Sequence, residues 1–124
     1  MKKILFLLTV LVMISCKKEE KITVEQPIKE IVEKISGKEL FENKGNCVAC
    51  HQPSQKVIGP SLEEISKIYK DKNASIVSFL KEESEPIVDP SQYEVMKTNF
   101  PITKAMSDEE LLALEEYIHT FHKQ

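Results

Sequence analysis

Two cysteines and a histidine form a short pattern that can fix an iron-bearing cofactor. Cys47 and Cys50 are three positions apart, and His51 follows directly. At this spacing each thiol can reach one vinyl group of a porphyrin, and the adjacent imidazole falls under the iron as an axial ligand. The pattern therefore predicts one covalently bound haem c, attached through both cysteines. Because the iron carries the chemistry of such a cofactor, the pattern also predicts a redox protein.

A Cys-x-x-Cys pair has two other common uses, zinc binding and thiol–disulfide exchange. A structural zinc site needs four ligands, and the sequence has no second cysteine pair. His119 and His122 have a spacing that could supply two nitrogens, but they stand near the end of an acidic helix, where solvated histidine is the ordinary case. A thioredoxin-type switch needs a βαβ context, which the sequence lacks. We therefore favour haem over both.

The composition limits the other classes of function. The chain has 124 residues, which allows one small domain, and 41% of them are hydrophobic and 30% charged. Its basic residues are all lysine, which argues against nucleic-acid recognition, where the arginine fork is favoured. No general base, nucleophile or Gly-rich phosphate loop is evident. We therefore expect an electron carrier with redox protein partners, and neither a catalytic site nor a small-molecule substrate.

The N-terminus has the pattern of an export signal. Two lysines precede residues 4–14, an apolar run with one threonine that is too short to span a bilayer comfortably. Ser15 followed by Cys16 resembles a bacterial lipobox, in which cleavage before the cysteine leaves its sulfur carrying a lipid. We expect residues 1–15 to be a lipoprotein signal peptide and Cys16 to be the lipid attachment site. An uncleaved anchor or an ordinary signal peptide is the alternative.

Residues 16–36 are then the lipidated cysteine and a flexible tether. Lysine and glutamate balance in this segment, large apolar residues are few, and Pro27 lies in its middle. The lipid would anchor the protein to a membrane, on the extracytoplasmic side of the bacterial cell envelope, facing the periplasm. Two cysteines assigned to haem and one to lipid also leave no thiol for a disulfide.

The rest of the chain, residues 37–124, has helical patterns and no strand-like alternation. Capping boxes Ser36-x-x-Glu39 and Ser107-x-x-Glu110 indicate two helix starts. We expect residues 52–60 to be a loop and residues 99–104 to be extended, the latter partly because of Pro101. The expected helices, with their N-caps, are 37–43 (Ser36), 62–70 (Ser61), 74–83 (Asn73), 90–95 (Asp89) and a last helix from 108 to the C-terminus (Ser107).

Residues 37–121 resemble the class I c-type cytochromes, and within them the short bacterial ones. Residues 37–41 are similar to the first helix of that family, and the attachment motif follows six residues later. Residues 59–62 look like the loop after the attachment motif, and residues 107–118 look like the last helix. The resemblance implies an all-α fold of about four to five short helices around one covalently bound haem. It also implies that the first and last helices cross.

At that crossing, Gly37 and Phe41 would meet Leu114 and Tyr117. A residue without a side chain permits close approach of the two backbones there. The resemblance further implies that the carbonyl of Pro60 accepts a hydrogen bond from the imidazole of the axial histidine. Such a bond orients the ring and raises its basicity.

The resemblance implies a methionine as the sixth iron ligand, and the sequence offers two. Met96 lies 45 residues after His51, a spacing typical of the short family members, whereas Met106 lies 55 residues after it. Met106 directly precedes the cap Ser107 and has Leu111 five residues on, which is the hydrophobic-staple pattern. We therefore favour Met96, although the Met-Pro pair common in the family is absent.

These observations predict a membrane-tethered monohaem cytochrome c that passes single electrons between respiratory partners. Two alternatives remain open. The protein could be a haem-based gas sensor or ligand-binding module, if the methionine ligand is weak. It could also be a dedicated subunit through which electrons enter a terminal oxidase or a nitrogen-oxide reductase.

Overall fold

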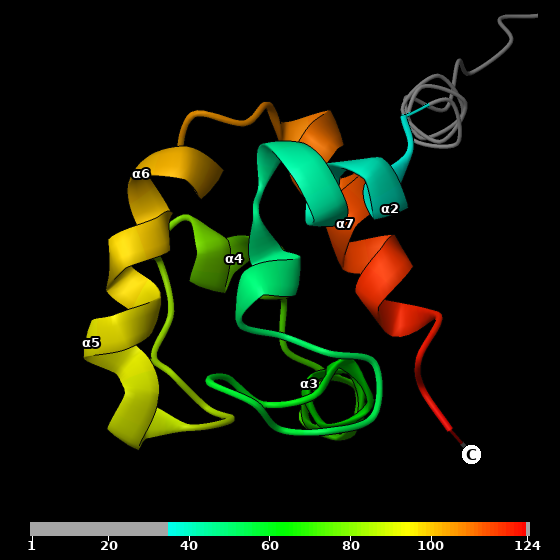
Figure 1. The fold of residues 1–124 in the computed structure, drawn as a ribbon, viewed down its shortest axis with the longest axis vertical. Coiled ribbons are helices and arrows are strands. Elements are labelled where there is room, and N and C mark those ends of the chain that lie inside the picture. Colours follow the sequence, from blue (N-terminus) through cyan, green and yellow to red (C-terminus); the bar gives the residue numbers. More distant parts are fainter. Residues whose placement is uncertain (1–34, 124) are drawn as a thin grey trace, which may run out of the picture.

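Short helices joined by turns make up residues 35–123, the part of the chain that the computed structural model describes (Figure 1). Within these residues no strand forms, and a single isolated bridge joins His51 to Lys56. The all-α prediction is thereby confirmed. The α-helices are α2 (Gly37–Glu39), α3 (Leu62–Asp71), α4 (Ile76–Leu80), α5 (Tyr93–Met96), α6 (Phe100–Thr103) and α7 (Asp108–His119).

Tighter or wider helical turns extend several of these helices. A π-helical turn, η1 (Leu40–Lys44), continues α2, and the 3₁₀ turns are η2 (Cys47–Ala49), η3 (Pro90–Gln92) and η4 (Lys97–Asn99). No helix in residues 35–123 is long and apolar enough to cross a membrane. The predicted signal peptide, Cys16 and residues 17–34 of the tether lie outside the described residues.

Three of the helices begin at the serine N-caps that the sequence predicts. The hydroxyls of Ser36, Ser61 and Ser107 each accept a hydrogen bond, at 3.2 Å, from the backbone N–H three residues later. Each bond satisfies one of the N–H groups that a helix start leaves without an intrahelical partner. At α7 the capping box is complete, because Glu110 also accepts from the backbone N–H of Ser107 at 2.9 Å.

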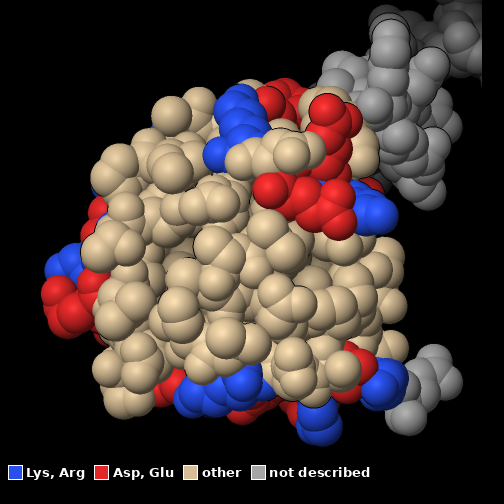
Figure 2. Space-filling model, in the orientation of Figure 1, with Lys and Arg blue, Asp and Glu red and all other residues tan. Residues whose placement is uncertain are grey.

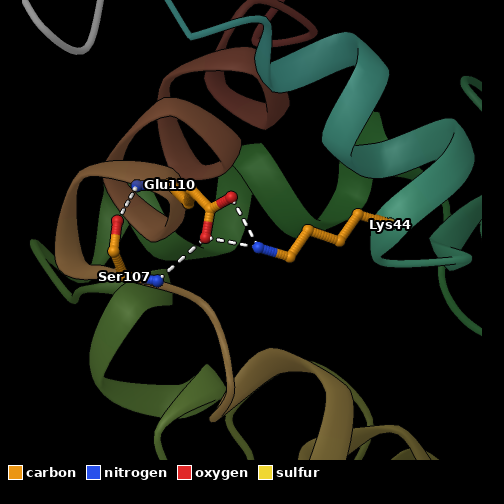
Figure 3. Close-up of polar contacts among 3 residues, drawn as sticks. All are labelled: Lys44, Ser107 and Glu110. Atoms are coloured by element: carbon orange, nitrogen blue, oxygen red, sulfur yellow. Dashed lines mark hydrogen bonds and ion pairs between the residues drawn. The ribbon is translucent and has the colours of Figure 1, made fainter.

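The same glutamate joins the start of α7 to the segment before the haem motif. Figure 3 shows Lys44, at the end of η1, reaching both carboxylate oxygens of Glu110, each 2.6 Å from its Nζ. The ammonium of Lys44 and the bond from Ser107 lower the pKa of Glu110. One carboxylate therefore both caps α7 and holds the chain that leads into the cysteines.

The first and last helices, α2 and α7, lie side by side, as the resemblance implies (Figure 1). A Cβ atom on Gly37 would lie 2.0 Å from the carbonyl oxygen of Ala113 and 2.7 Å from Cβ of Tyr117. Phe41 meets Tyr117 with ring centroids 5.6 Å apart. The predicted close approach at Gly37 is confirmed, and it explains why any side chain there would separate the helices.

Helix α4 begins later and ends earlier than the sequence predicts. Its N-cap is Ser75, whose hydroxyl accepts from the N–H of Ser78 at 3.3 Å, and not Asn73. Asn73 has a left-handed backbone (φ 48°) in the turn after α3, so it ends one helix instead of starting the next. Glu82, also left-handed (φ 60°), stops the chain from remaining helical to residue 83.

Residues 97–103 are helical in η4 and α6, and the prediction of an extended segment over residues 99–104 is wrong. Phe100 is 2% exposed and Thr103 is fully buried, with its hydroxyl donating to the carbonyl of Leu80 at 2.8 Å. Pro101 stands in the first turn of α6, where a missing N–H costs nothing. Burial of these side chains outweighs the preference of Phe100, the residue before proline, for an extended backbone.

Candidate haem site

An apolar cavity of about 230 Å³ lies between the Cys47–His51 segment and helices α3, α4 and α5. Helix α3 contributes Ile65 and Tyr69 to its wall, and α4 contributes Phe79. Apolar walls of this kind suit a flat, largely hydrophobic ligand. The cavity is therefore the place to look for the residues that the sequence singles out.

Both cysteines of the motif line this cavity. The 3₁₀ turn η2 brings them together, because the N–H groups of Cys50 and His51 both donate to the carbonyl of Cys47, at 3.1 and 2.9 Å. Asn46, with φ 49°, provides the left-handed residue that turns the chain into η2. The tight turn directs two thiols and an imidazole from five consecutive residues into one space.

The two thiols are free and are not joined to each other. Burial raises the pKa of Cys47 to about 11, with the neighbouring Cys50 as a lesser cause. A thiol with so high a pKa is protonated at neutral pH, whereas disulfide exchange requires the thiolate. The surroundings of Cys47 therefore argue against the dithiol alternative.

The imidazole of His51 is oriented by the loop that follows it. Its Nδ1 lies 2.7 Å from the carbonyl oxygen of Pro60. A carbonyl can only accept, so Nδ1 carries the proton and Nε2 keeps its lone pair for a metal. Burial lowers the pKa of His51 and the Pro60 bond opposes this, so the ring is neutral at pH 7. A neutral ring with a free Nε2 is the form that binds iron.

Gly59 packs against the face of the same ring. A Cβ atom at Gly59 would lie 2.4 Å from Cε1 and 2.8 Å from Nδ1 of His51. In the sequence, Gly59 stands out only as part of a family-like loop, and this contact is not predicted. A glycine followed by the proline that accepts the imidazole bond was the available signal, but nothing local shows that the ring returns to it.

The two candidate methionines occupy different surroundings. Met96, at the end of α5, lines the cavity together with His51. Met106 is 6% exposed, belongs to the core cluster with Leu111, and is not among the residues that line the cavity. The structure thus brings only Met96 of the two into the space that the haem motif faces.

No other metal centre competes with this site in the described part of the chain. Within residues 35–123, no three His, Cys, Asp or Glu side chains are placed to hold a metal ion together. Nδ1 of His119 lies 3.1 Å from the hydroxyl of the buried Ser66, and His119 is not among the residues that line the cavity with the cysteines. The H-x-x-H spacing therefore does not complete a site with Cys47 and Cys50.

A comparison with protein families decides the assignment. The family described as Cytochrome c matches residues 35–122, more than two thirds of the chain. The chain belongs to the cytochrome c family. Its helical fold is consistent with the class I monohaem cytochromes, as the resemblance implies, and the family carries covalently bound haem c, typically one in a protein of this size.

A curated relative is similar over a short stretch. Cytochrome c-552 of Nitrosomonas europaea is 53% identical over 30 residues, which are 24% of this chain and 29% of the relative. The match thus spans less than a third of either protein. It supports an electron-transfer haem protein, and its short span carries no conclusion about partners.

The residues present fit a covalent haem c. Cys47 and Cys50 would form the two thioether bonds, and the neutral imidazole of His51 would bind the iron, each from the wall of one apolar cavity. The bound group supplies a one-electron couple, which no side chain of this cytochrome could provide. What the chain does is hold the group, exclude water from one side of it with apolar walls, and keep the imidazole neutral and oriented through Pro60.

Proposed function

We propose that this cytochrome is a membrane-tethered electron carrier of the cell envelope, in which His51 and Met96 are the axial ligands of the haem iron. The observation that supports the carrier function best is that His51 and Met96 line one cavity with both cysteines. Two axial side chains leave no open iron position for a substrate. Little ligand rearrangement then accompanies a change of oxidation state, which suits electron transfer.

The ligand types also favour a carrier with a raised potential. A thioether is a weaker donor to oxidised iron than a thiolate or a second imidazole, and apolar walls disfavour the extra positive charge of the oxidised state. Met106 is buried in the core cluster that includes Leu111 of α7, and it precedes the N-cap Ser107, which is the position of a hydrophobic staple. We therefore propose no role for Met106 at the iron.

Matched leucine variants test the ligand assignment. Leucine conserves the volume of methionine, so the packing cost of either substitution is expected to be less than about 1.5 kcal/mol. Met96→Leu is expected to abolish the sulfur-to-iron absorption band of the oxidised protein and to let reduced protein bind CO rapidly. Met106→Leu is expected to keep the band. Loss of the band in Met106→Leu alone would refute the assignment. Rapid CO binding by the wild-type protein would also refute it and would favour the gas sensor.

We propose that redox partners dock on an uncharged face. Figure 2 shows a face whose centre holds no lysine or acidic side chain, with charges gathered along its edges. In the same orientation, η1 lies toward the top of the view, the turn of the haem motif lies near its middle, and α5 lies at the left (Figure 1). Val48, between the two cysteines, is 37% exposed, and Val57, in the loop that follows His51, is 55% exposed. Exposed apolar side chains around a cofactor favour a partner with an apolar surface.

Val57→Asp tests this docking surface, because Val57 does not line the cavity. Oxidation of the reduced variant by membranes of the source cells is expected to slow, with an unchanged midpoint potential. The wild-type rate is expected to depend little on ionic strength, since screening acts on charge pairs. A rate that falls steeply with added salt, together with a neutral effect of Val57→Asp, would place the docking site elsewhere.

The tether rests on the sequence of the N-terminus. Cys16→Ser is expected to release the cytochrome from the membrane fraction, while the haem spectrum stays the same. Continued membrane association of this variant would exclude the lipid anchor. Co-purification of the wild-type protein with one terminal oxidase or nitrogen-oxide reductase would identify a dedicated subunit in place of a free carrier.

A further inference from the structure

One acidic side chain breaks the apolar character of the cavity wall. Among the described residues that line the cavity, Asp89 is the only carboxylate. It stands in the loop between α4 and η3, and its side chain is 16% exposed. A charge in such surroundings interacts more strongly with its neighbours than a charge in water. The charge of Asp89 can therefore act on a cofactor bound in this cavity.

Asp89 is paired on both of its carboxylate oxygens. Nζ of Lys56 lies 2.5 Å from Oδ2, and the hydroxyl of Ser91 donates to Oδ1 at 2.5 Å. The Lys56 bond, followed by the Ser91 bond, lowers the pKa of Asp89, so the group is ionised at neutral pH. Asp89 precedes η3 at the predicted N-cap position, but its side chain makes no capping bond to η3.

The two partners differ in their relation to the cavity. Asp89 lines it, whereas Lys56 does not and has a side chain that is 54% exposed. The negative charge is thus nearer to the cofactor space than the positive charge that offsets it. Lys56 belongs to the loop after His51, and Asp89 precedes the helix that carries Met96, so the pair also joins these two segments.

We propose that Asp89 tunes the reduction potential of the haem, and that Lys56 limits how much of the carboxylate charge the iron experiences. The proposal rests on the electron-transfer function, since it concerns the one-electron couple of the bound haem. Oxidised iron carries one more positive charge than reduced iron. A nearby carboxylate therefore stabilises the oxidised state and lowers the potential, and an ammonium beside the carboxylate raises it again.

Charge-removing variants of the pair separate this role from a structural one. Lys56→Gln leaves the carboxylate without its counter-charge, so the midpoint potential is expected to fall. Asp89→Asn keeps the shape and the bond from Ser91 but removes the charge, so the potential is expected to rise. The double variant is expected to lie between the wild type and Asp89→Asn. Loss of a merely structural link would shift both single variants in the same direction, because each breaks the same contact.

The measurement is a spectroelectrochemical titration of the holoprotein at low ionic strength. The control pair is Lys67→Gln and Asp71→Asn, an ion pair within α3 whose side chains are 64% and 54% exposed and do not line the cavity. Its shifts are expected to be smaller than those of the Lys56–Asp89 pair. If Asp89→Asn yields no haem protein, Lys56→Gln and Lys56→Glu give a graded series, with the lower potential expected for glutamate.

Three results would overturn the proposal. The first is a shift of the same sign in Lys56→Gln and Asp89→Asn. The second is a potential that does not fall from Lys56→Gln to Lys56→Glu. The third is shifts no larger than those of the control pair. None of these results affects the carrier function, which fails separately if the wild-type holoprotein shows no reversible one-electron couple.

Discussion

Replacing Gly37 with alanine tests the helix crossing that holds one side of the haem domain together. The added Cβ would lie 2.0 Å from the carbonyl oxygen of Ala113, whereas ordinary contacts begin at 3.4 Å, a shortfall of 1.4 Å. The atom in the way belongs to the backbone of α7 and cannot rotate aside. Helices α2 and α7 must therefore move apart, and the contact between Phe41 and Tyr117 must loosen with them.

The expected cost follows from two opposing effects. Alanine in place of glycine stabilises a helix by about 0.5–1 kcal/mol. Forcing extra atoms into a packed contact destabilises by about 1–3 kcal/mol. Because the clash at Gly37 is with backbone, we expect the second effect to prevail, with a net loss of about 1–2 kcal/mol. For a domain of this size, that loss lowers the unfolding temperature by about 4–16 °C.

The assay is thermal unfolding of the holoprotein, followed by far-ultraviolet circular dichroism and by the visible absorption of the haem. Lys38→Ala is the control, because Lys38 is the next residue of α2 and its side chain is 64% exposed. A surface change of this kind is expected to alter stability by less than about 0.5 kcal/mol. An unfolding temperature of Gly37→Ala at or above that of the wild type would refute the close-packed crossing.

Three further variants test the site, the cap of α7 and the corrected cap of α4. Gly59→Ala would press on the ring of His51, whose Cε1 is 2.4 Å from the added Cβ. We therefore expect the stability to fall by about 1–3 kcal/mol and the midpoint potential to change. Wild-type stability and potential would contradict the contact. Glu110→Gln removes the charge that Lys44 pairs with, and we expect a loss of about 1 kcal/mol at neutral pH. The pKa of Glu110 is lowered in the fold, so the stabilisation that its charge provides is present above the ordinary pKa of 4.5 and is lost as pH falls through the folded pKa. The unfolding free energies of the variant and the wild type, measured by chemical denaturation, should therefore converge in acid. A difference that stays constant with pH would refute this. Ser75→Ala is expected to lose about 1 kcal/mol in denaturant unfolding, and no loss would show that Ser75 is not the cap.

Signals that act over a few residues allowed correct predictions from the sequence. The caps Ser36, Ser61 and Ser107 form as predicted, because each bond joins a hydroxyl to an amide three residues away. The haem motif is local in the same way, since one 3₁₀ turn brings its thiols and imidazole together. Neither depends on where the rest of the chain lies.

The wrong predictions lie where burial competes with a local preference. Pro101 favours an extended residue before it, yet Phe100 is helical because its ring is buried against Phe79, with centroids 5.4 Å apart. Asn73 is a good cap by type, but the backbone turns through it in a left-handed conformation and leaves the cap to Ser75. Such outcomes depend on contacts between segments, which no window of the sequence contains.

By itself the sequence determined the chemistry of this cytochrome, because the spacing of Cys47, Cys50 and His51 fixes what their side chains can reach within five residues. Only the tertiary structure decided which methionine shares their cavity and which carboxylate faces it. Met96 lies 45 positions beyond His51, and Lys56 lies 33 positions before Asp89. Segments so far apart meet only when the helices pack, and the burial of apolar side chains that drives this packing is a property of the whole fold.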